Sequence, residues 1–226
     1  MLNMKLIFFD TETSGLNCRS SRIIELAMLT VVDGKIIDEY DEFVDIGERL
    51  DPKITELTGI TDNDLDEKGL YEDVIADDLM ERLTPGTVMI AHNCQFDLSF
   101  VYHLLKRHYP NEAYETLASL KWIDTVTILK DCKDYPHKLI DAVEFFELEK
   151  VNFHRAIDDT KALYDVFQKL KEIRPVCEYK NLFGYNPKWD IKNNEKFEFI
   201  NYMPQPYHNR GQLPLDEILP RKKSNF

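Results

Sequence analysis

The sequence predicts an α/β domain built on a mixed β-sheet, and three observations predict it. A short run at 5–9, apolar in every residue after Lys5, is typical of a buried central strand. Asp33-Gly34 stands between two strand-like segments, as in a two-residue hairpin. Farther along, helix-like and strand-like segments follow one another. The resulting order, β-β-β-α-β-α-β-α-α, indicates a mixed sheet with an antiparallel hairpin rather than an alternating doubly wound sheet.

The first part of the chain supplies three strands and an acidic, turn-rich segment. The run at 5–9 forms the first strand, and 23–32 forms the second. After the turn at Asp33-Gly34, 36–44 returns antiparallel to the second strand. Residues 50–70 are rich in acidic and turn-forming residues, so turns are expected there.

The second part supplies amphipathic helices and two short strands. Phe96, Phe100 and Leu104 recur at helical spacing. Pro85-Gly86 ends the preceding helix, and Pro175 closes the last one. The expected helices cover about 72–83, 95–106, 125–131, 138–147 and 156–172, and the expected strands are 88–91 and 121–124.

The composition fits one core domain with an appendage. The chain has 226 residues, of which 43% are hydrophobic and 12% aromatic, enough for an ordinary core. The expected division is a core domain at 1–173 and a proline- and aromatic-rich extension at 174–226. Six of the ten prolines lie in that extension, together with Tyr185 and Trp189, for which core packing is favoured over stacking on bases.

Cysteine usage and hydropathy indicate a reduced, non-membrane compartment. Cys18, Cys94, Cys132 and Cys177 are scattered without a CxxC or a His/Cys cluster, which favours reduced thiols over disulfides or a zinc site. No apolar run approaches the ~18 residues of a membrane span, and the N-terminus has no signal-peptide layout. A cytoplasmic location without membrane contact is therefore expected.

The net charge of −13 argues against broad electrostatic binding of nucleic acid. The charge is unevenly spread, because 174–226 carries 9 Lys/Arg against 6 Asp/Glu, whereas 1–173 carries 19 against 35. Bound divalent cations would reduce the negative charge of the domain. The extension is where electrostatic help in binding a polyanion is expected.

Two carboxylates end the first strand. Asp10 and Glu12 are two residues apart, so they face the same side of the sheet as Phe8. The ordinary alternative makes Asp10 a helix cap and leaves Glu12 in solvent.

Two further carboxylates lie on the apolar faces of predicted helices. Asp97 stands three residues before Phe100, and Asp159 stands four before Leu163. N-terminal capping is the ordinary alternative for Asp97. An ionised carboxylate in the interior is costly unless it is paired or binds a metal. Arg155, one turn earlier, is the nearest candidate partner of Asp159.

These four carboxylates would repel one another if the fold brought them together. Divalent cations with oxygen ligands relieve that repulsion, and Mg²⁺ or Mn²⁺ suits an all-carboxylate site. Two such ions about 3.5–4 Å apart can hold the attacking and leaving oxygens of a phosphoryl displacement. Convergence therefore predicts a site for metal-assisted phosphodiester chemistry.

His154 is the candidate general base. It lies five residues before Asp159, near the start of the last helix, so both can border one cleft. Adjacent cations would keep its imidazole neutral and able to take a proton from water. The other histidines are interpreted as structural: His92, His103, His108, His137 and His208.

Three motifs resemble those of the DEDDh 3′→5′ exonucleases. They read Asp-Thr-Glu-Thr-Ser-Gly-Leu at 10–16, His-Asn-Cys-Gln-Phe-Asp at 92–97 and His-Arg-Ala-Ile-Asp-Asp at 154–159. That family includes the proofreading subunit of bacterial replicative DNA polymerase, RNase T and oligoribonuclease, and the resemblance covers about 4–172. The sister subclass places a tyrosine at the position of Arg155, so the histidine subclass is favoured.

The resemblance implies a ribonuclease H-like fold with a mixed five-stranded sheet flanked by helices, followed here by an irregular C-terminal extension. It implies metal ligands for two divalent cations and a general base at His154. It also implies a nucleotide pocket lined by three side chains, with Asn93 and Phe96 supporting the second motif; Glu25 stays structural. The implied ligands are Asp10, Glu12, Asp97 and Asp159, and the implied pocket residues are Thr13, Leu16 and Ile60.

The expected activity is divalent-metal-dependent release of 5′-mononucleotides from the 3′ end of single-stranded DNA or RNA. A polymerase or another protein is a candidate partner. One alternative is a non-catalytic accessory or nucleic-acid-binding module on the same fold. Another is an aspartyl-phosphate phosphatase of the haloacid dehalogenase type, although that chemistry wants a second Asp where this chain has Glu12.

Overall fold

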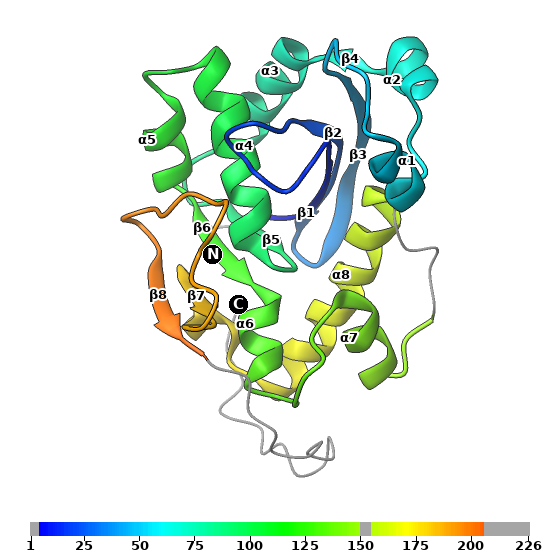
Figure 1. The fold of residues 1–226 in the computed structure, drawn as a ribbon. Coiled ribbons are helices and arrows are strands. Elements are labelled where there is room, and N and C mark those ends of the chain that lie inside the picture. The colour runs from blue at the N-terminus through cyan, green and yellow to red at the C-terminus, as the bar shows by residue number, and fades with distance from the viewer. Residues whose placement is uncertain (1–4, 150–154, 206–226) are drawn as a thin grey trace.

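The fold is an eight-stranded mixed sheet with helices on both faces (Figure 1). The computed structural model describes residues 5–149 and 155–205. Along the sheet the strand order is β4-β3-β2-β1-β5-β6-β7-β8. Strand β2 pairs antiparallel with β1 on one side and with β3 on the other. The remaining pairs, β3–β4, β1–β5, β5–β6, β6–β7 and β7–β8, are parallel. The strands are β1 Lys5–Thr13, β2 Ile23–Val32, β3 Lys35–Asp45, β4 Leu70–Tyr71, β5 Val88–Ala91, β6 Lys121–Asp124, β7 Leu182–Tyr185 and β8 Asn201–Pro204.

Alternation along β1 divides the core into two layers. Ile7 and Phe9 pack in the cluster formed with α3, α4 and α5. Phe8 points to the opposite face, where it packs with residues of α6, α7 and α8. In Figure 1, α4 crosses in front of the sheet. The helices are α1 Pro52–Thr58, α2 Asp62–Lys68, α3 Glu72–Arg82, α4 Cys94–His108, α5 Ala113–Ala118, α6 Thr125–Lys130, α7 Leu139–Phe145 and α8 Ala156–Ile173, followed by a 3₁₀ turn at Val176–Tyr179.

The predicted fold class is confirmed, and the predicted strands and longer helices are present within a few residues of their expected bounds. The acidic segment 50–70 differs, because it forms α1, α2 and β4 rather than turns alone. Helices of seven residues are too short to show a clear apolar period, so in the sequence only their capping residues mark them as helices. Asp51 caps α1 by accepting a bond from the Lys53 backbone N–H, and Thr61 and Asp64 form a capping box at α2. Helix α5 was also not predicted.

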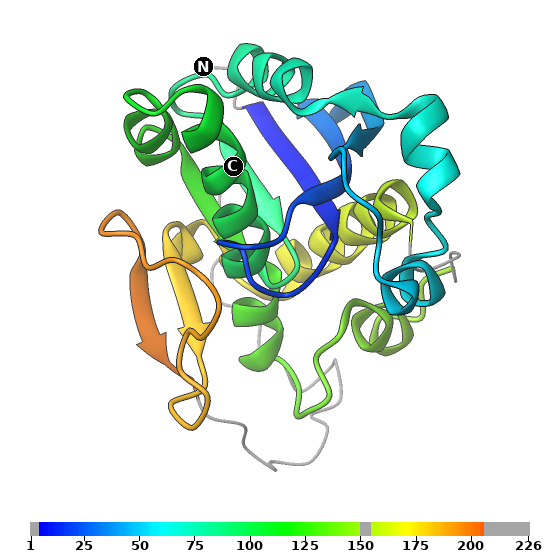
Figure 2. The same ribbon diagram turned by 45° about the horizontal axis from the view of Figure 1, so that its top comes forward.

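The C-terminal extension is more regular than expected, and its strands β7 and β8, together with β4, raise the sheet from the five predicted strands to eight. Strand β7 pairs with β6, and β8 pairs with β7, so both continue the sheet beyond β6 (Figure 2). Phe183 and Phe197 are buried in the same cluster as α4. Trp189 is 54% exposed, so its predicted core packing is wrong. The division into 1–173 and 174–226 stays a prediction.

A membrane-spanning helix needs about 20 predominantly apolar residues. Within 5–149 and 155–205, none of the helices is both long and apolar enough to cross a bilayer.

Candidate active site

The end of β1 brings two carboxylates to the α8 face of the sheet. Asp10 and Glu12 share the face of Phe8, because side chains alternate along a strand. Helix α8 packs on that face and carries Asp159 in its first turn. One carboxylate oxygen from each of Asp10, Glu12 and Asp159 lies within 4.8 Å of the other two. The structure thus brings together three of the four predicted ligands as a compact group.

The fourth predicted ligand, Asp97, comes from the opposite layer. Thr11 points toward α4, and Asp97 Oδ1 accepts bonds from the Thr11 backbone N–H at 3.1 Å and from its hydroxyl at 2.7 Å. These two bonds fix the buried Asp97 carboxylate against the strand end, beside Asp10. Asp97 lies outside the three-residue group but close enough to raise the pKa of Asp10.

Asp124 holds the start of α4 in place and was not predicted. It ends β6 and is 4% exposed. Its Oδ1 accepts backbone N–H bonds from Asn93 at 2.9 Å, from Cys94 at 3.2 Å and from Val126 at 3.1 Å. One carboxylate therefore anchors the first residues of both α4 and α6. Asn93 itself adopts φ 71°, a left-handed conformation that Asn tolerates, and lets the chain turn into α4.

Glu25 holds the start of α8. It stands directly opposite Glu12 in the β1–β2 pairing and its side chain is fully buried. Glu25 Oε1 accepts bonds from Arg155 at 2.8 and 2.9 Å, and Oε2 accepts the Ala156 backbone N–H at 3.1 Å. Arg155, the partner considered for Asp159, thus pairs with Glu25, whose expected structural role fits this position. The pair fixes the helix end that presents Asp159.

Crowding of acidic groups dominates the electrostatics of the site. Burial, then the Asp97, Asp159 and Glu12 carboxylates, raise the pKa of Asp10 well above its usual value. Burial and the neighbouring carboxylates, Asp159 first among them, raise the pKa of Glu12 to about 7. Burial raises the pKa of Asp97 to about 7, although its bonds from Thr11 act in the other direction.

Ionisation of these crowded carboxylates is unfavourable without a counter-charge, and a bound cation would supply that charge. The donor atoms are carboxylate oxygens, the ligands that hard dications prefer, and they are close enough to share one ion. The acidic group can therefore hold a metal, and the ion would offset the repulsion that raises the pKa values.

The remaining predicted site residues lie in different environments. Thr13 is buried and its hydroxyl donates to the Gly15 carbonyl at 2.8 Å, whereas Leu16 is 73% exposed on the loop after β1. Ile60 is 1% exposed among Ile24, Leu50 and Leu65, and Phe96 is partly buried with its ring 4.7 Å from that of Phe100. Their roles in binding a nucleotide stay predictions. His154 lies outside the described residues.

The chain resembles known exonucleases and polymerases in sequence. The sequence profile of the exonuclease family named RNase_T matches residues 7–167. The chain is 32% identical over 174 residues to a DNA polymerase III PolC-type of Caldanaerobacter subterraneus subsp. tengcongensis, which covers 76% of this chain and 12% of that protein. It is 34% identical over 176 residues to a DNA polymerase III PolC-type of Bacillus subtilis, covering 74% of this chain and 11% of that protein. The chain thus spans only a small part of the length of these relatives.

Solved structures share the fold at low sequence identity. Exonuclease I of E. coli in complex with a dA16 oligonucleotide superposes with a TM-score of 0.65 and 18% identity, covering 76% of this chain and 41% of that one. Exonuclease I of Methylocaldum szegediense gives a TM-score of 0.67 and 21% identity, covering 76% of this chain and 41% of that one.

Proposed function

This chain belongs to the exonuclease family whose profile spans its residues 7–167, and from that premise we propose that it releases 5′-mononucleotides, one at a time, from the 3′ end of a single-stranded nucleic acid. The single observation that carries the proposal is the convergence of Asp10, Glu12 and Asp159 within 4.8 Å, with Asp97 beside them. These carboxylates come from three segments, and the pKa values of Asp10, Glu12 and Asp97 are raised, which an ordinary structural role does not require.

The chain's own residues have distinct roles in this proposal. Asp10, Glu12, Asp97 and Asp159 would hold two divalent cations, Mg²⁺ or Mn²⁺. Such ions, when bound, supply Lewis-acid activation of water and stabilisation of the leaving 3′ oxygen. His154 would accept the proton of the attacking water, since the third motif places it just before α8.

The proposed substrate is a single strand with an accessible 3′ end. Leu16 is 73% exposed on the loop that follows Glu12, where an apolar side chain can contact the terminal base. The solved E. coli Exonuclease I holds a dA16 oligonucleotide, which supports a single-stranded substrate for this fold. Similarity to PolC-type polymerases supports a polymerase as a candidate protein partner. We also propose that 174–226 acts as an extension of the 1–173 exonuclease domain.

A degradation panel tests the function. The full chain is incubated with 5′-labelled and 3′-labelled single- and double-stranded DNA and RNA, with Mg²⁺ and with EDTA. We expect a 3′-labelled single strand to release its label first as a mononucleotide, and a 5′-labelled strand to shorten in one-nucleotide steps, only with Mg²⁺. Binding of Mn²⁺ and of an oligonucleotide without cleavage of any substrate would instead support the non-catalytic accessory module.

The assignment of His154 as general base is tested by His154→Ala. Loss of a proton acceptor is expected to lower kcat by about 10²- to 10⁴-fold while calorimetric Mn²⁺ affinity stays within about twofold. His108→Ala, at the far end of α4, is the matched control and should leave both quantities unchanged. An equal loss of Mn²⁺ affinity and turnover in His154→Ala would make His154 a metal ligand rather than a base.

A further inference from the structure

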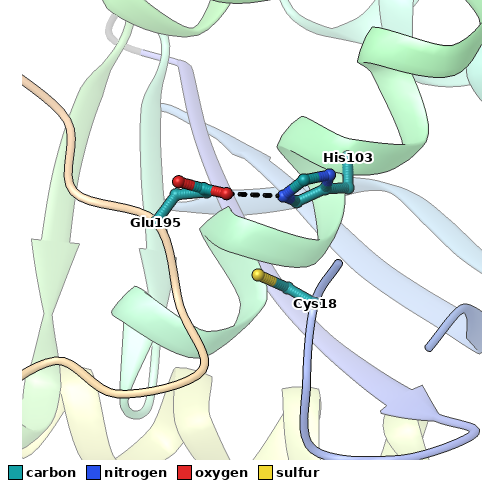
Figure 3. Close-up of side chains that lie close together, drawn as sticks. All are labelled: Cys18, His103 and Glu195. Carbon is teal, nitrogen blue, oxygen red and sulfur yellow. Dashed lines mark hydrogen bonds and ion pairs between the residues drawn. The ribbon is translucent and has the colours of Figure 1, made fainter. Parts of the chain in front are cut away.

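A second group of potential metal ligands is separate from the group of Asp10, Glu12 and Asp159. Cys18, His103 and Glu195 each offer one ligand atom, and these three atoms lie within 4.8 Å of one another. They come from the loop between β1 and β2, from α4, and from the segment between β7 and β8 (Figure 3). Cys18 is fully buried, whereas the side chains of His103 and Glu195 are 17% and 25% exposed.

The backbone on both sides fixes this arrangement. On α4, Gln95, Ser99 and His103 follow one another at four-residue spacing and so share a helix face. Ser99 Oγ accepts the Glu195 backbone N–H at 3.1 Å, and Gln95 Nε2 donates to the Glu195 carbonyl at 2.5 Å. The Cys18 backbone N–H donates to the Asn193 carbonyl at 3.2 Å. These bonds therefore hold the segments that carry Cys18 and Glu195 next to each other and against α4.

The donor set is chemically different from that of the active site. One thiol sulfur, one imidazole nitrogen and one carboxylate oxygen match the ligands of Zn²⁺, which binds them at about 2.0–2.3 Å. Mg²⁺ and Mn²⁺ prefer oxygen ligands and are poorly served by a thiolate. Ligand atoms of a tetrahedral zinc site lie about 3.3–3.8 Å apart, so the 2.9 Å contact of His103 Nε2 with Glu195 Oε1 would lengthen slightly to admit the ion.

We propose that Cys18, His103 and Glu195 form a zinc site, with water from the exposed side as the fourth ligand. The ion ties the loop after Glu12, which carries Leu16, to α4 and to the C-terminal extension. Its role is structural, because it holds together three segments that are distant in the sequence. The site stands independently of the proposed exonuclease activity.

The metal-free alternative is a hydrogen-bonded ion pair. Glu195 Oε1 lies 3.0 Å from Arg19 Nε as well as 2.9 Å from His103 Nε2. Burial raises the pKa of Glu195, but the bonds from His103 and Arg19 outweigh it, so its pKa is lowered and it is a carboxylate. This alternative uses His103 and Glu195 but gives no function to the buried thiol beside them. The two interpretations differ in whether the sulfur of Cys18 binds an ion.

Cobalt substitution distinguishes them, since a thiolate bound to Co²⁺ gives a near-ultraviolet charge-transfer band that an all-carboxylate site does not. The full chain is treated with chelator, dialysed and titrated with Co²⁺ and then Zn²⁺. We expect one equivalent of Co²⁺ to produce the band and one of Zn²⁺ to remove it. Asp10→Asn should retain the band, which separates this site from the active site.

Variants complete the test. Cys18→Ser is expected to abolish the band, and Glu195→Gln, which keeps the side-chain shape, is expected to weaken Zn²⁺ binding at least about 10-fold. Cys177→Ser is the matched control, because Cys177 is a partly exposed thiol outside the proposed site. This variant should leave the band and the Zn²⁺ affinity unchanged. Absence of the band in the unmodified chain, or equal Zn²⁺ affinity in Glu195→Gln, would overturn the proposal and leave the ion pair. The Zn²⁺ affinity of Glu195→Gln tests the proposal even if Cys18→Ser does not fold.

Discussion

Asp10→Asn is expected to abolish metal-dependent release of mononucleotides while making the metal-free protein more stable. The carboxylate lies in the three-residue group with Glu12 and Asp159, so its loss removes a central ligand. Charge stabilisation by a bound cation contributes several kcal/mol, and about 4 kcal/mol corresponds to a 10³-fold change in rate. We therefore expect kcat/KM to fall by about 10³-fold or more, measured with saturating Mg²⁺.

The stability of the same variant should change in the opposite direction. Without metal, the folded state holds several carboxylates whose pKa values are raised by burial and by one another. Removing one charge relieves this repulsion. Since each 1 kcal/mol corresponds to about 2–4 °C in Tm for a chain of this length, we expect Asp10→Asn to melt several degrees higher in EDTA. Added Mn²⁺ should reverse the order by stabilising only the unmodified protein.

The same argument gives a pH dependence for the metal-free protein. Glu12 and Asp97 have pKa values of about 7 in the folded protein, above the ordinary 4.5 and 3.8. The folded state therefore binds more protons than the unfolded state between these limits, and its stability falls as the pH rises through about 4 to 7. This fall should be smaller in Asp10→Asn and smaller again with Mn²⁺.

Asp158→Asn is the control for all three measurements. Asp158 neighbours Asp159 on α8 but does not belong to the three-residue group. It should retain activity, Tm and pH dependence close to those of the unmodified chain. If Asp10→Asn kept its Mg²⁺-dependent activity, or melted at the same temperature as Asp158→Asn in EDTA, the repulsive cluster would not exist as described.

Arg155→Met is expected to destabilise the fold by about 3–5 kcal/mol, because it leaves a buried carboxylate without its charged partner. Glu25 is fully buried and accepts both bonds from Arg155. The methionine keeps the apolar stem that lies by Phe43, where the guanidinium is 5.0 Å from the ring centre. A loss of about 3 kcal/mol lowers Tm by about 10 °C. Chemical denaturation measures the change directly.

Two comparisons isolate the buried charge as the cause. Lys161→Met, on α8, removes an ion pair with Glu39 at 2.7 Å whose partners are 45% and 49% exposed, so it should cost at most about 1 kcal/mol. The double variant Arg155→Met/Glu25→Gln removes both charges and should recover much of the lost stability. Equal destabilisation by Arg155→Met and Lys161→Met would show that the pair does not anchor α8.

Local patterns were sufficient for five of the eight described strands and for singling out the four carboxylates. The apolar run before Asp10 and the Asp33-Gly34 turn are short-range signals, and they gave β1 and the β2–β3 hairpin. Asp97 and Asp159 were identifiable because a carboxylate on the apolar face of a helix requires an explanation. Periodicity failed where the elements were short, as in helices α1 and α2.

Interactions between distant segments could not be predicted. Asp124 looks like an ordinary strand-end cap until its bonds to Asn93 and Cys94, about 30 residues away, are known. Glu25 and Arg155 are 130 residues apart. In each case the sequence identifies a polar residue at the end of a helix or strand, but its hydrogen-bond partner is known only from the three-dimensional structure.

The Cys18, His103 and Glu195 group illustrates the same limit. His103 and Glu195 are 92 positions apart, and no spacing motif links them to Cys18. The scattered cysteines therefore argued against a zinc site, as spacing rules must when ligands come from three remote segments. The extension also lacked apolar periodicity, because its two strands have only four residues each.

The most direct test of the account is anomalous diffraction at the manganese edge from crystals of this protein soaked in Mn²⁺. Asp10, Glu12 and Asp159 should surround a strong anomalous peak, with Asp97 on a second ion or on the same one. No peak between these side chains, with the Asp159 carboxylate turned away from Asp10, would contradict the account.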